Sequence, residues 1–409
     1  MRALRPAVVA LLLAWAGHPA SARAHSVFSV GGLGEPQLEE PARLRALGGA
    51  GVAERGPRAF SMVNPASLAD ADHLLIEGTV LSALRRIDAA GYPSETGTEA
   101  TIPSLRAVVA LPGRIVLGGA YLAATNAQFR VDRQDTSGPF SQIRVEGSGG
   151  INFARVSLSR RLTPSIALGV DCDFVLGGYR EEWARTPVDS TLATARDTVE
   201  LEYRRRARWR VGALATRGGF SLGAVFETER GLPLRVAQST AGASSSRDLG
   251  DLTLPAGFVI GASAPVTARD RVVAQYRRAS WSRSSLASDL VDFRALERWS
   301  LGFERRTPEE EGGGGLGRLP IRVGGYYLRW PDRLPSAGAA DLSGGIAEVN
   351  EWALTLGTGI RSKDKGGAVD LSLEAGSRGS VADLGARERF VRLGISLQVS
   401  DDTWKGRFH

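Results

Sequence analysis

The chain has 409 residues, a formal net charge of +7 and a composition that is 43% hydrophobic and 7% aromatic. Cys172 is the only cysteine, which excludes an intrachain disulfide and a metal cluster held by several thiolates. The basic balance by itself would allow nucleic-acid binding. The arginines are scattered along the chain and form no single patch, so we expect no nucleic-acid partner.

The first residues predict export. Arg2 and Arg5 precede an apolar run over residues 7–17, and Ala22-Arg23-Ala24 follows as an A-x-A motif. This order is typical of a secretory signal peptide, here residues 1–24, with cleavage after Ala20 or Ala22 as the alternatives. The apolar run is shorter than the roughly 20 residues that a membrane-spanning helix needs. No later stretch is long and apolar enough for one either.

Residues 25–72 differ from the rest, since they are rich in glycine and turn-forming residues and show little alternation. From residue 73 to residue 400 the chain alternates apolar and polar residues with a period of two. In the last such run, Val391, Leu393 and Ile395 share one face, while Arg392 and Gly394 share the other. This period indicates strands with one apolar face.

These runs predict about fourteen strands, each on the order of ten residues, which is near the length that crosses a bilayer at a tilt. The expected strands are 74–87, 102–112, 114–131, 143–161, 165–181, 199–217, 219–238, 256–266, 270–283, 294–306, 319–332, 348–361, 367–378 and 388–400. Long polar connections (88–101, 182–198, 239–255 and 333–347) alternate with mostly tight turns.

Alternating long and short connections are typical of an outer-membrane β-barrel with periplasmic turns. We therefore expect an all-β fold: a transmembrane antiparallel β-barrel over residues 73–400, with both ends periplasmic, followed by a tail over 401–409. A soluble periplasmic β-protein and a β-solenoid are the alternatives. The sequence has no fixed-period repeat, which counts against a solenoid.

Three arginine pairs test the strand registers: Arg85-Arg86, Arg160-Arg161 and Arg277-Arg278. One member of each pair must face lipid unless the pair lies at a strand end. A lipid-facing arginine costs about 2–4 kcal/mol at the bilayer midplane and little at the interfaces. The pairs are therefore expected near strand ends.

Two motifs before the barrel suggest a family. Residues 47–53 read LGGAGVA and residues 60–68 read FSMVNPASL. They resemble the N-terminal signature of the FadL/TodX outer-membrane transport family, in which a GGAG(V/A)A stretch precedes NPA(G/S)L. Residues 254–265, 272–282 and 321 to the end are also similar to that family. Glu54 to Arg58 departs from the Asp-rich spacing that the family has between the two motifs.

The resemblance implies that residues 25–72 fold into the barrel as a hatch that plugs the lumen. It further implies passive uptake of hydrophobic or amphipathic small molecules, fatty-acid-like or aromatic, gated by this hatch. The expected hatch and gating residues are Gly48, Gly49, Gly51, Phe60, Met62, Val63, Asn64, Pro65 and Ala66. The glycines allow close backbone approach to the wall, and Asn64-Pro65 is a turn signal.

Other functions remain open. A non-transporting barrel that serves as a scaffold or shuttle for secreted proteins is the main alternative. A lipid hydrolase would need a histidine base, and only His73 is placed to serve as one. We expect no enzyme, no cofactor and no metal site, since no metal-ligand spacing or nucleotide-binding loop is present; the pair Asp171 and Asp173 is expected to line the lumen.

The expected location is the outer membrane of a Gram-negative-type bacterium. The expected partners are a hydrophobic small-molecule substrate, outer-membrane lipid and lipopolysaccharide, and the barrel assembly machinery during biogenesis. The protein is expected to be a monomer.

Overall fold

The computed structural model describes residues 26–29, 33–56, 61–134, 140–189, 191, 193–203, 206–240, 243–284, 292–306, 319–339, 342–361 and 367–401. The expected signal peptide, the C-terminal tail beyond residue 401 and Phe60 lie outside these residues. Within them, no helix is long and apolar enough to cross a membrane.

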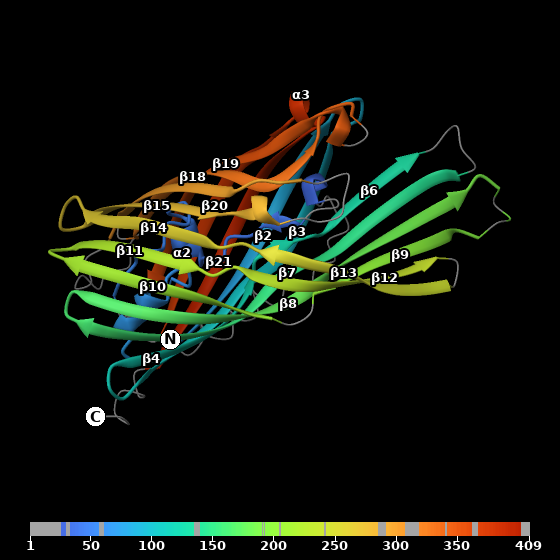
Figure 1. Cartoon of the computed structure of the whole chain (residues 1–409). Coiled ribbons are helices and arrows are strands. Elements are labelled where there is room, and N and C mark those ends of the chain that lie inside the picture. Colours follow the sequence, from blue (N-terminus) through green and yellow to red (C-terminus); the bar gives the residue numbers. More distant parts are fainter. Residues whose placement is uncertain are drawn as a thin grey trace, which may run out of the picture.

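Fourteen antiparallel strands form a closed barrel within the described residues (Figure 1). They are β2 (Leu74–Ala89), β3 (Glu95–Leu111), β4 (Ile115–Ala123), β7 (Phe140–Thr163), β8 (Ile166–Pro187), β10 (Ala207–Arg217), β11 (Phe220–Glu227), β14 (Gly257–Pro265), β15 (Asp270–Ala279), β17 (Leu296–Arg305), β18 (Ile321–Pro335), β19 (Ile346–Arg361), β20 (Gly367–Ser380) and β21 (Ala386–Asp401). The first and last strands close the ring by pairing along their whole length, from Leu74 with Asp401 to Ala89 with Ala386. The predicted transmembrane barrel is confirmed.

The remaining elements are short or extend the wall. The short ones are η1 (Val27–Ser29), β1 (Glu35–Pro36), α2 (Ala42–Arg45), η2 (Pro65–Asp70), β5 (Thr125–Asn126), η3 (Trp281–Arg283), β16 (Asp292–Phe293), η5 (Leu342–Gly344) and α3 (Val381–Leu384). The longer ones are β6 (Phe129–Gln134), β9 (Ala195–Tyr203), β12 (Arg230–Thr240) and β13 (Ala243–Leu254).

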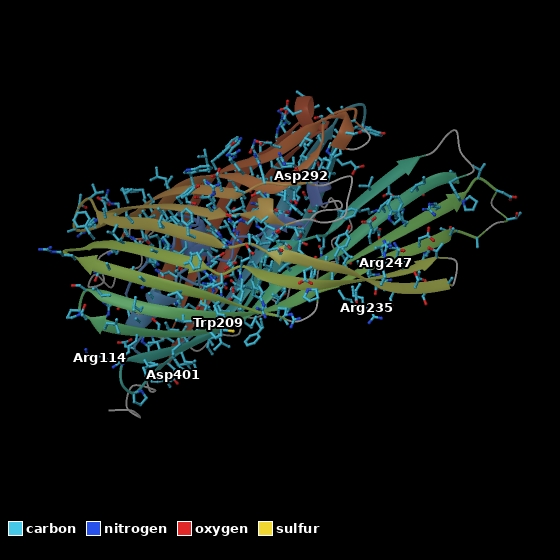
Figure 2. All side chains as sticks on the ribbon, viewed as in Figure 1. Arg114, Trp209, Arg235, Arg247, Asp292 and Asp401 are labelled. Atoms are coloured by element: carbon cyan, nitrogen blue, oxygen red, sulfur yellow. The ribbon has the colours of Figure 1, made fainter. Side chains whose placement is uncertain are left out.

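The sheet formed by β6, β7, β8, β9, β12 and β13 continues well beyond the rest of the wall (Figure 1). The outer part of β7 pairs with β6 and β8, β8 pairs with β9, and β12 lies between β9 and β13. We call this six-stranded projection the outer sheet. It lies at the end of the barrel opposite Arg114 and Asp401, whereas Arg235 and Arg247 belong to it (Figure 2). Long connections of outer-membrane barrels are extracellular, so the outer sheet faces the exterior of the cell.

The outer sheet corrects the expected loops. Residues 182–198 and 239–255 were expected to be long polar loops, yet β8 runs to Pro187, β9 starts at Ala195, and β13 spans most of the second range. Likewise β3 starts at Glu95, inside the expected loop 88–101. These hairpins stand in water, so their outward side chains are polar and the alternation that marks a lipid-facing strand is absent.

Aromatic rings mark the outer edge of the lipid-facing surface. Tyr276, Trp299, Tyr327 and Trp352 lie opposite one another on four neighbouring strands. The ring centroids are 5.3 Å apart for the first pair and 5.9 Å apart for the second. Trp209, also exposed, lies on the outer surface of β10 (Figure 2). Such a girdle is typical of the membrane interface of a barrel.

The three arginine pairs lie near strand ends, as predicted. Arg85-Arg86 is close to the outer end of β2, Arg160-Arg161 is close to the end of β7, and Arg277-Arg278 is close to the end of β15. Arg85 is buried in the lumen while Arg86 is exposed. At these positions the strand registers expected from the sequence therefore agree with the structure.

The described parts of residues 26–73, which we call the N-terminal segment, pack inside the barrel. Leu44 and Leu47 contact Val273 of β15 in one apolar cluster. Glycines of the wall make room for the segment's backbone: a Cβ added at Gly223 would lie 2.0 Å from the carbonyl oxygen of Val52. At Gly169 it would lie 2.5 Å from the carbonyl carbon of Pro65.

Candidate functional site

The lumen is held together by ion pairs between the N-terminal segment and the wall. Glu35 in β1 is buried and contacts three arginines: Arg85 at 2.6 Å, Arg378 at 2.9 Å and Arg392 at 2.6 Å. The three arginines belong to β2, β20 and β21, and each lies on the lumen-facing side of its strand. One carboxylate thus ties the segment to three strands.

A second group of ion pairs holds the segment on the other side of the lumen. Glu54 contacts Arg271 of β15 at 2.8 Å and Arg43 of the segment itself at 2.9 Å. Glu304 of β17 contacts the same two arginines, at 2.7 Å and 3.3 Å. Because these charges lie in the interior, removing one member of the network would leave it with an uncompensated charge.

The predicted glycines lie where the segment touches the wall. Gly48 has φ +68°, and a Cβ there would lie 2.4 Å from the carbonyl oxygen of Gly325. Its amide donates to Thr355 Oγ1 at 3.1 Å. The amide of Gly51 donates to Gln275 Oε1 at 2.9 Å. Gly49, with φ +78°, lines the cavity described below.

The second predicted motif is buried against β8 and β10. Asn64 is completely buried, and its amide nitrogen donates to the carbonyl oxygens of Val52 at 2.8 Å and Ala213 at 3.0 Å. Its side-chain oxygen accepts from the amide of Ala66 at 3.0 Å and so caps η2, which begins at Pro65.

Carbonyls of the same motif accept from wall arginines. Arg210 donates to the carbonyl oxygens of Met62, at 3.2 Å, and Val63. Asp171 and Asp173 face the lumen as expected and pair with the arginines there: Asp171 with Arg210 at 3.2 Å, and Asp173 with Arg208 at the same distance. Charged side chains of the wall therefore bind the backbone of the N-terminal segment.

A cavity of about 1000 Å³, including space open to solvent, lies between the N-terminal segment and the wall. Its apolar lining includes Leu33, Ile151, Phe153, Leu254, Trp281 and Leu328. Its polar lining includes Glu39, Arg208, Glu227, Gln275, Arg277 and Arg298. Such a cavity suits a ligand with an apolar body and one charged or polar group. Among the predicted site residues that the structure describes, Gly49 and Val63 line it.

Arg298 differs from the other arginines of the cavity. Arg208 pairs with Asp173 at 3.2 Å, and Arg277 with Glu227 at 3.3 Å. Arg298 is buried, donates to the carbonyl oxygen of Gly48 at 2.9 Å, and stacks 3.9 Å from the ring centre of Tyr326. No carboxylate of the described residues is within ion-pair distance of it. A buried cation without a counter-charge favours an anionic ligand group.

The polarity of the wall reverses above the cavity. Inside the barrel, the lumen-facing odd residues of β8 include the buried acids Asp171 and Asp173, and even residues such as Val170 and Phe174 are exposed to lipid. In the outer sheet, the inward face is apolar and carries Phe129, Val145 and Tyr179, which cluster together. This face continues the lumen surface of β8 outward from the cavity, and so extends an apolar surface away from the membrane.

The opposite face of the outer sheet is covered with ion pairs. Asp132 contacts Arg130 and Arg144, both at 2.7 Å, and Arg180 contacts Glu200 at 2.9 Å. Burial raises the pKa of Asp132, but hydrogen bonds from the two arginines outweigh it and hold the pKa below its usual value. A charged outward face is suited to water and unsuited to lipid.

The wall is also incomplete beside β3. Among the described residues, β3 pairs with β4 only between Ser104 and Leu111, while residues 95–101 of β3 pair on the β2 side alone. The next part of the neighbouring chain, β5, pairs instead with β1 of the N-terminal segment, Glu35 opposite Asn126. The segment therefore covers an interruption in the strand pairing.

Apart from Gly49 and Val63, sequence reasoning did not find the cavity residues. Phe153, Trp281 and Arg298 lie in or next to wall strands, where the alternating pattern makes them look like any other inward residue. One signal was available for Arg298: it precedes Trp299, whose outward position fixes Arg298 as a lumen residue. Its lack of a carboxylate partner depends on the three-dimensional arrangement.

The profile of the BamG family matches residues 4–219, which is more than half of the chain. No curated protein matches the sequence.

Solved structures share the fold. The Pseudomonas aeruginosa FadL homologue has a TM-score of 0.62 and 14% identity, with 90% of this chain and 99% of that chain covered. The Pseudomonas putida toluene transporter TodX has a TM-score of 0.58 and 16% identity, covering 90% and 98%. The CymD monoaromatic hydrocarbon channel gives 0.56 and 16%, also covering 90% and 98%. These identities are low, so the likeness concerns the barrel fold.

Proposed function

The chain belongs to the BamG family, and from its barrel and cavity we propose that it is an outer-membrane channel for amphipathic molecules with an apolar tail and an anionic head. Long-chain fatty acids have this chemistry. Structural neighbours with the same fold are described as a toluene transporter and as monoaromatic hydrocarbon channels, which supports passage of hydrophobic compounds.

The proposed route has two stages. The apolar inward face of the outer sheet, with Phe129 and Tyr179, collects the molecule, which then enters the cavity below. The N-terminal segment acts as a hatch: a shift of Gly48 to Gly51 and of Met62 to Ala66 opens a path through the lumen or through the interruption beside β3. Phe60, next to the second stretch, belongs to the same proposed gate.

Arg298 carries this proposal. It is buried, lines the cavity, and has no carboxylate partner among the described residues, so a ligand carboxylate would complete its charge pairing. Trp281 and Phe153 lie in the same cavity and offer apolar contacts to a tail. Charge-assisted hydrogen bonds between guanidinium and carboxylate are among the stronger ones in proteins.

The test compares a long-chain fatty acid with the alcohol of equal chain length by titration calorimetry on the purified full-length protein. We expect the acid to bind more tightly to the parent protein, and Arg298→Gln to weaken acid binding about tenfold or more while alcohol binding stays the same. Arg305→Gln, an exposed position on the same strand, is the matched control. Equal binding of acid and alcohol by the parent protein contradicts the proposal.

A second candidate function is a scaffold or shuttle barrel for secreted proteins. The observation that favours it is the pair of free edges of the outer sheet: among the described residues, β6 pairs only with β7, and β13 only with β12. Exposed strand edges can accept a strand of another protein. A stoichiometric protein partner that co-purifies with an empty cavity would favour this function over transport.

A further inference from the structure

Three arginines gather on the outer surface of the barrel where β21 and β2 leave the lipid-facing zone. Arg86 lies opposite Arg389, and Asp88 lies opposite Arg387. Leu84 and Val391 lie two residues further into the membrane on the same faces of these strands. They are apolar and exposed, and they lie opposite each other. The guanidinium groups thus stand directly above the apolar stripe, on the extracellular side.

This arginine patch, Arg86, Arg387 and Arg389, carries excess positive charge. The three side chains are 57%, 41% and 53% exposed, so their donors are available to a ligand. Asp88 is the one carboxylate of the described residues in ion-pair distance of the patch, at 3.2, 3.9 and 3.8 Å from the three guanidinium groups. Ser94 Oγ also donates to Asp88, at 2.7 Å. Three cations against one anion leave two positive charges uncompensated.

Other arginines at a similar place on the barrel are more fully compensated by carboxylates. Arg278 and Arg329 also lie just beyond the aromatic girdle, two residues after Tyr276 and Tyr327. They share Glu297, at 3.4 Å and 2.7 Å, and Arg329 also approaches Glu348 at 3.7 Å, a carboxylate that pairs with Arg294 as well. Two carboxylates thus face three arginines there, so the excess positive charge is larger at the patch on β2 and β21.

We propose that the arginine patch binds phosphate groups of an outer-leaflet glycolipid of the lipopolysaccharide type. A guanidinium presents paired donors that match phosphate oxygens. The acyl chains of such a lipid would lie beside Leu84 and Val391, while its phosphates would lie at the depth of the patch. An acidic protein surface would supply negative charge, but it would not contact the adjoining apolar stripe, which faces the bilayer. This inference is independent of what the lumen transports.

The experiment uses the full-length protein in a mild detergent and bisphosphorylated lipid A as the probe. The variant Arg86→Gln/Arg389→Gln removes two charges from the patch. The matched control, Arg278→Gln/Arg329→Gln, removes two charges from the more fully compensated group. We expect lipid A affinity to fall about tenfold or more in the first variant and to stay the same in the control. All these side chains are exposed or half-buried at the surface, and heat-induced unfolding on gels checks that each variant folds.

Three comparisons distinguish the ligand. Dephosphorylated lipid A is expected to bind the parent protein and the patch variant equally weakly. Equal affinity of the parent protein for both forms of lipid A overturns the proposal. It is also overturned if inorganic phosphate at the same phosphate concentration displaces the lipid completely, or if polyglutamate does, because the patch would then be a general anion surface.

Discussion

Backbone conformation at single residues decides how closely the N-terminal segment approaches the barrel wall. Gly48 combines a positive φ of +68° with a neighbouring carbonyl oxygen that a Cβ would meet at 2.4 Å. Gly113, in the turn between β3 and β4, has a positive φ of +78° but nothing within 4 Å of an added Cβ. Comparing substitutions at these two positions therefore separates the cost of backbone strain from the cost of steric conflict.

We expect Gly48→Ala to destabilise the protein by more than Gly113→Ala. The turn variant should cost about 1 kcal/mol, from backbone strain alone. The lumen variant should add about 1–3 kcal/mol of overpacking. Thermal unfolding of both variants, followed by the loss of the folded barrel on gels, gives the comparison. Equal destabilisation would show that the segment is not held against Gly325.

The stability of the outer sheet is expected to depend on pH through Asp132. Its pKa is lowered from a usual value of 3.8. A carboxyl with a lowered pKa contributes stability that is complete above the usual value and is lost as the pH falls through the lowered one. Above pH 4, therefore, its ion pairs with Arg130 and Arg144 should protect β6 and the outer part of β7.

The measurement is the rate of pepsin cleavage in the outer sheet, for the parent protein and for Asp132→Asn. The variant should be cleaved faster at about pH 4.5, and the ratio of the two rates should approach one as the pH falls below the lowered pKa. Because both proteins meet the same pepsin at each pH, the ratio cancels the enzyme's own pH dependence. A ratio that does not change with pH would contradict the assigned role.

At the scale of elements, Glu35 in β1 joins the N-terminal segment to β2, β20 and β21 through three arginines. Glu35→Gln should loosen the segment, since a buried charge pair that loses one partner costs about 3–5 kcal/mol. We expect a lower unfolding temperature and a higher ion conductance in planar bilayers. Glu95→Gln, an exposed position at the outer end of β3, is the control. Unchanged conductance would mean that β1 does not seal the lumen.

The strands were predictable to the extent that lipid contact shaped their sequence. In β21, Val391, Leu393 and Ile395 must face lipid, so the period of two is plain. In the outer part of β13 the side chains of residues 243–248 are exposed to water, and residues 243–250 read ASSSRDLG, which resembles a loop. The pairing of β12 with β13 follows from the neighbouring hairpins, which a local pattern does not contain.

The site was predictable in part for the same reason. Gly48, Gly51 and Asn64 stand out because backbone contacts demand particular residues at those positions. Arg298 does not stand out among the many lumen-facing arginines. Its distinction is the absence of a carboxylate partner among the described residues, and such an absence can be seen only when β17, β18 and the N-terminal segment are assembled.

At the scale of the whole molecule, the outer sheet can be shortened without opening the barrel. β11 pairs directly with β14, from Ser221 with Ser263 to Glu227 with Gly257, below the hairpin of β12 and β13. Replacing residues 229–255 with a short turn should leave the ring of strands closed, but it should lower the unfolding temperature because the buried Leu232, Leu234, Leu252 and Leu254 are lost from the apolar core. Fatty-acid uptake by cells should become severalfold slower, because part of the apolar inward face is lost.

The same variant separates the two candidate functions. If the protein transports, uptake slows and no protein partner is lost on purification. If it serves as a scaffold, uptake is unaffected, and a partner bound at the edge of β13 disappears. Unchanged uptake with no change in co-purifying proteins would contradict both functions for this part of the molecule.

The reversal of polarity along β7 and β8 also bears on how the protein reaches its final state. The ion-paired face that carries Arg130, Asp132 and Arg144 must pass through the hydrocarbon layer before it reaches the far side. A lipid-exposed arginine or lysine costs about 2–4 kcal/mol at the midplane. Pairing these charges before passage, or passing them through a protein-lined opening, would lower that barrier. Insertion of this barrel should therefore be slow in pure lipid bilayers and far more dependent on a catalyst than insertion of a barrel with short loops.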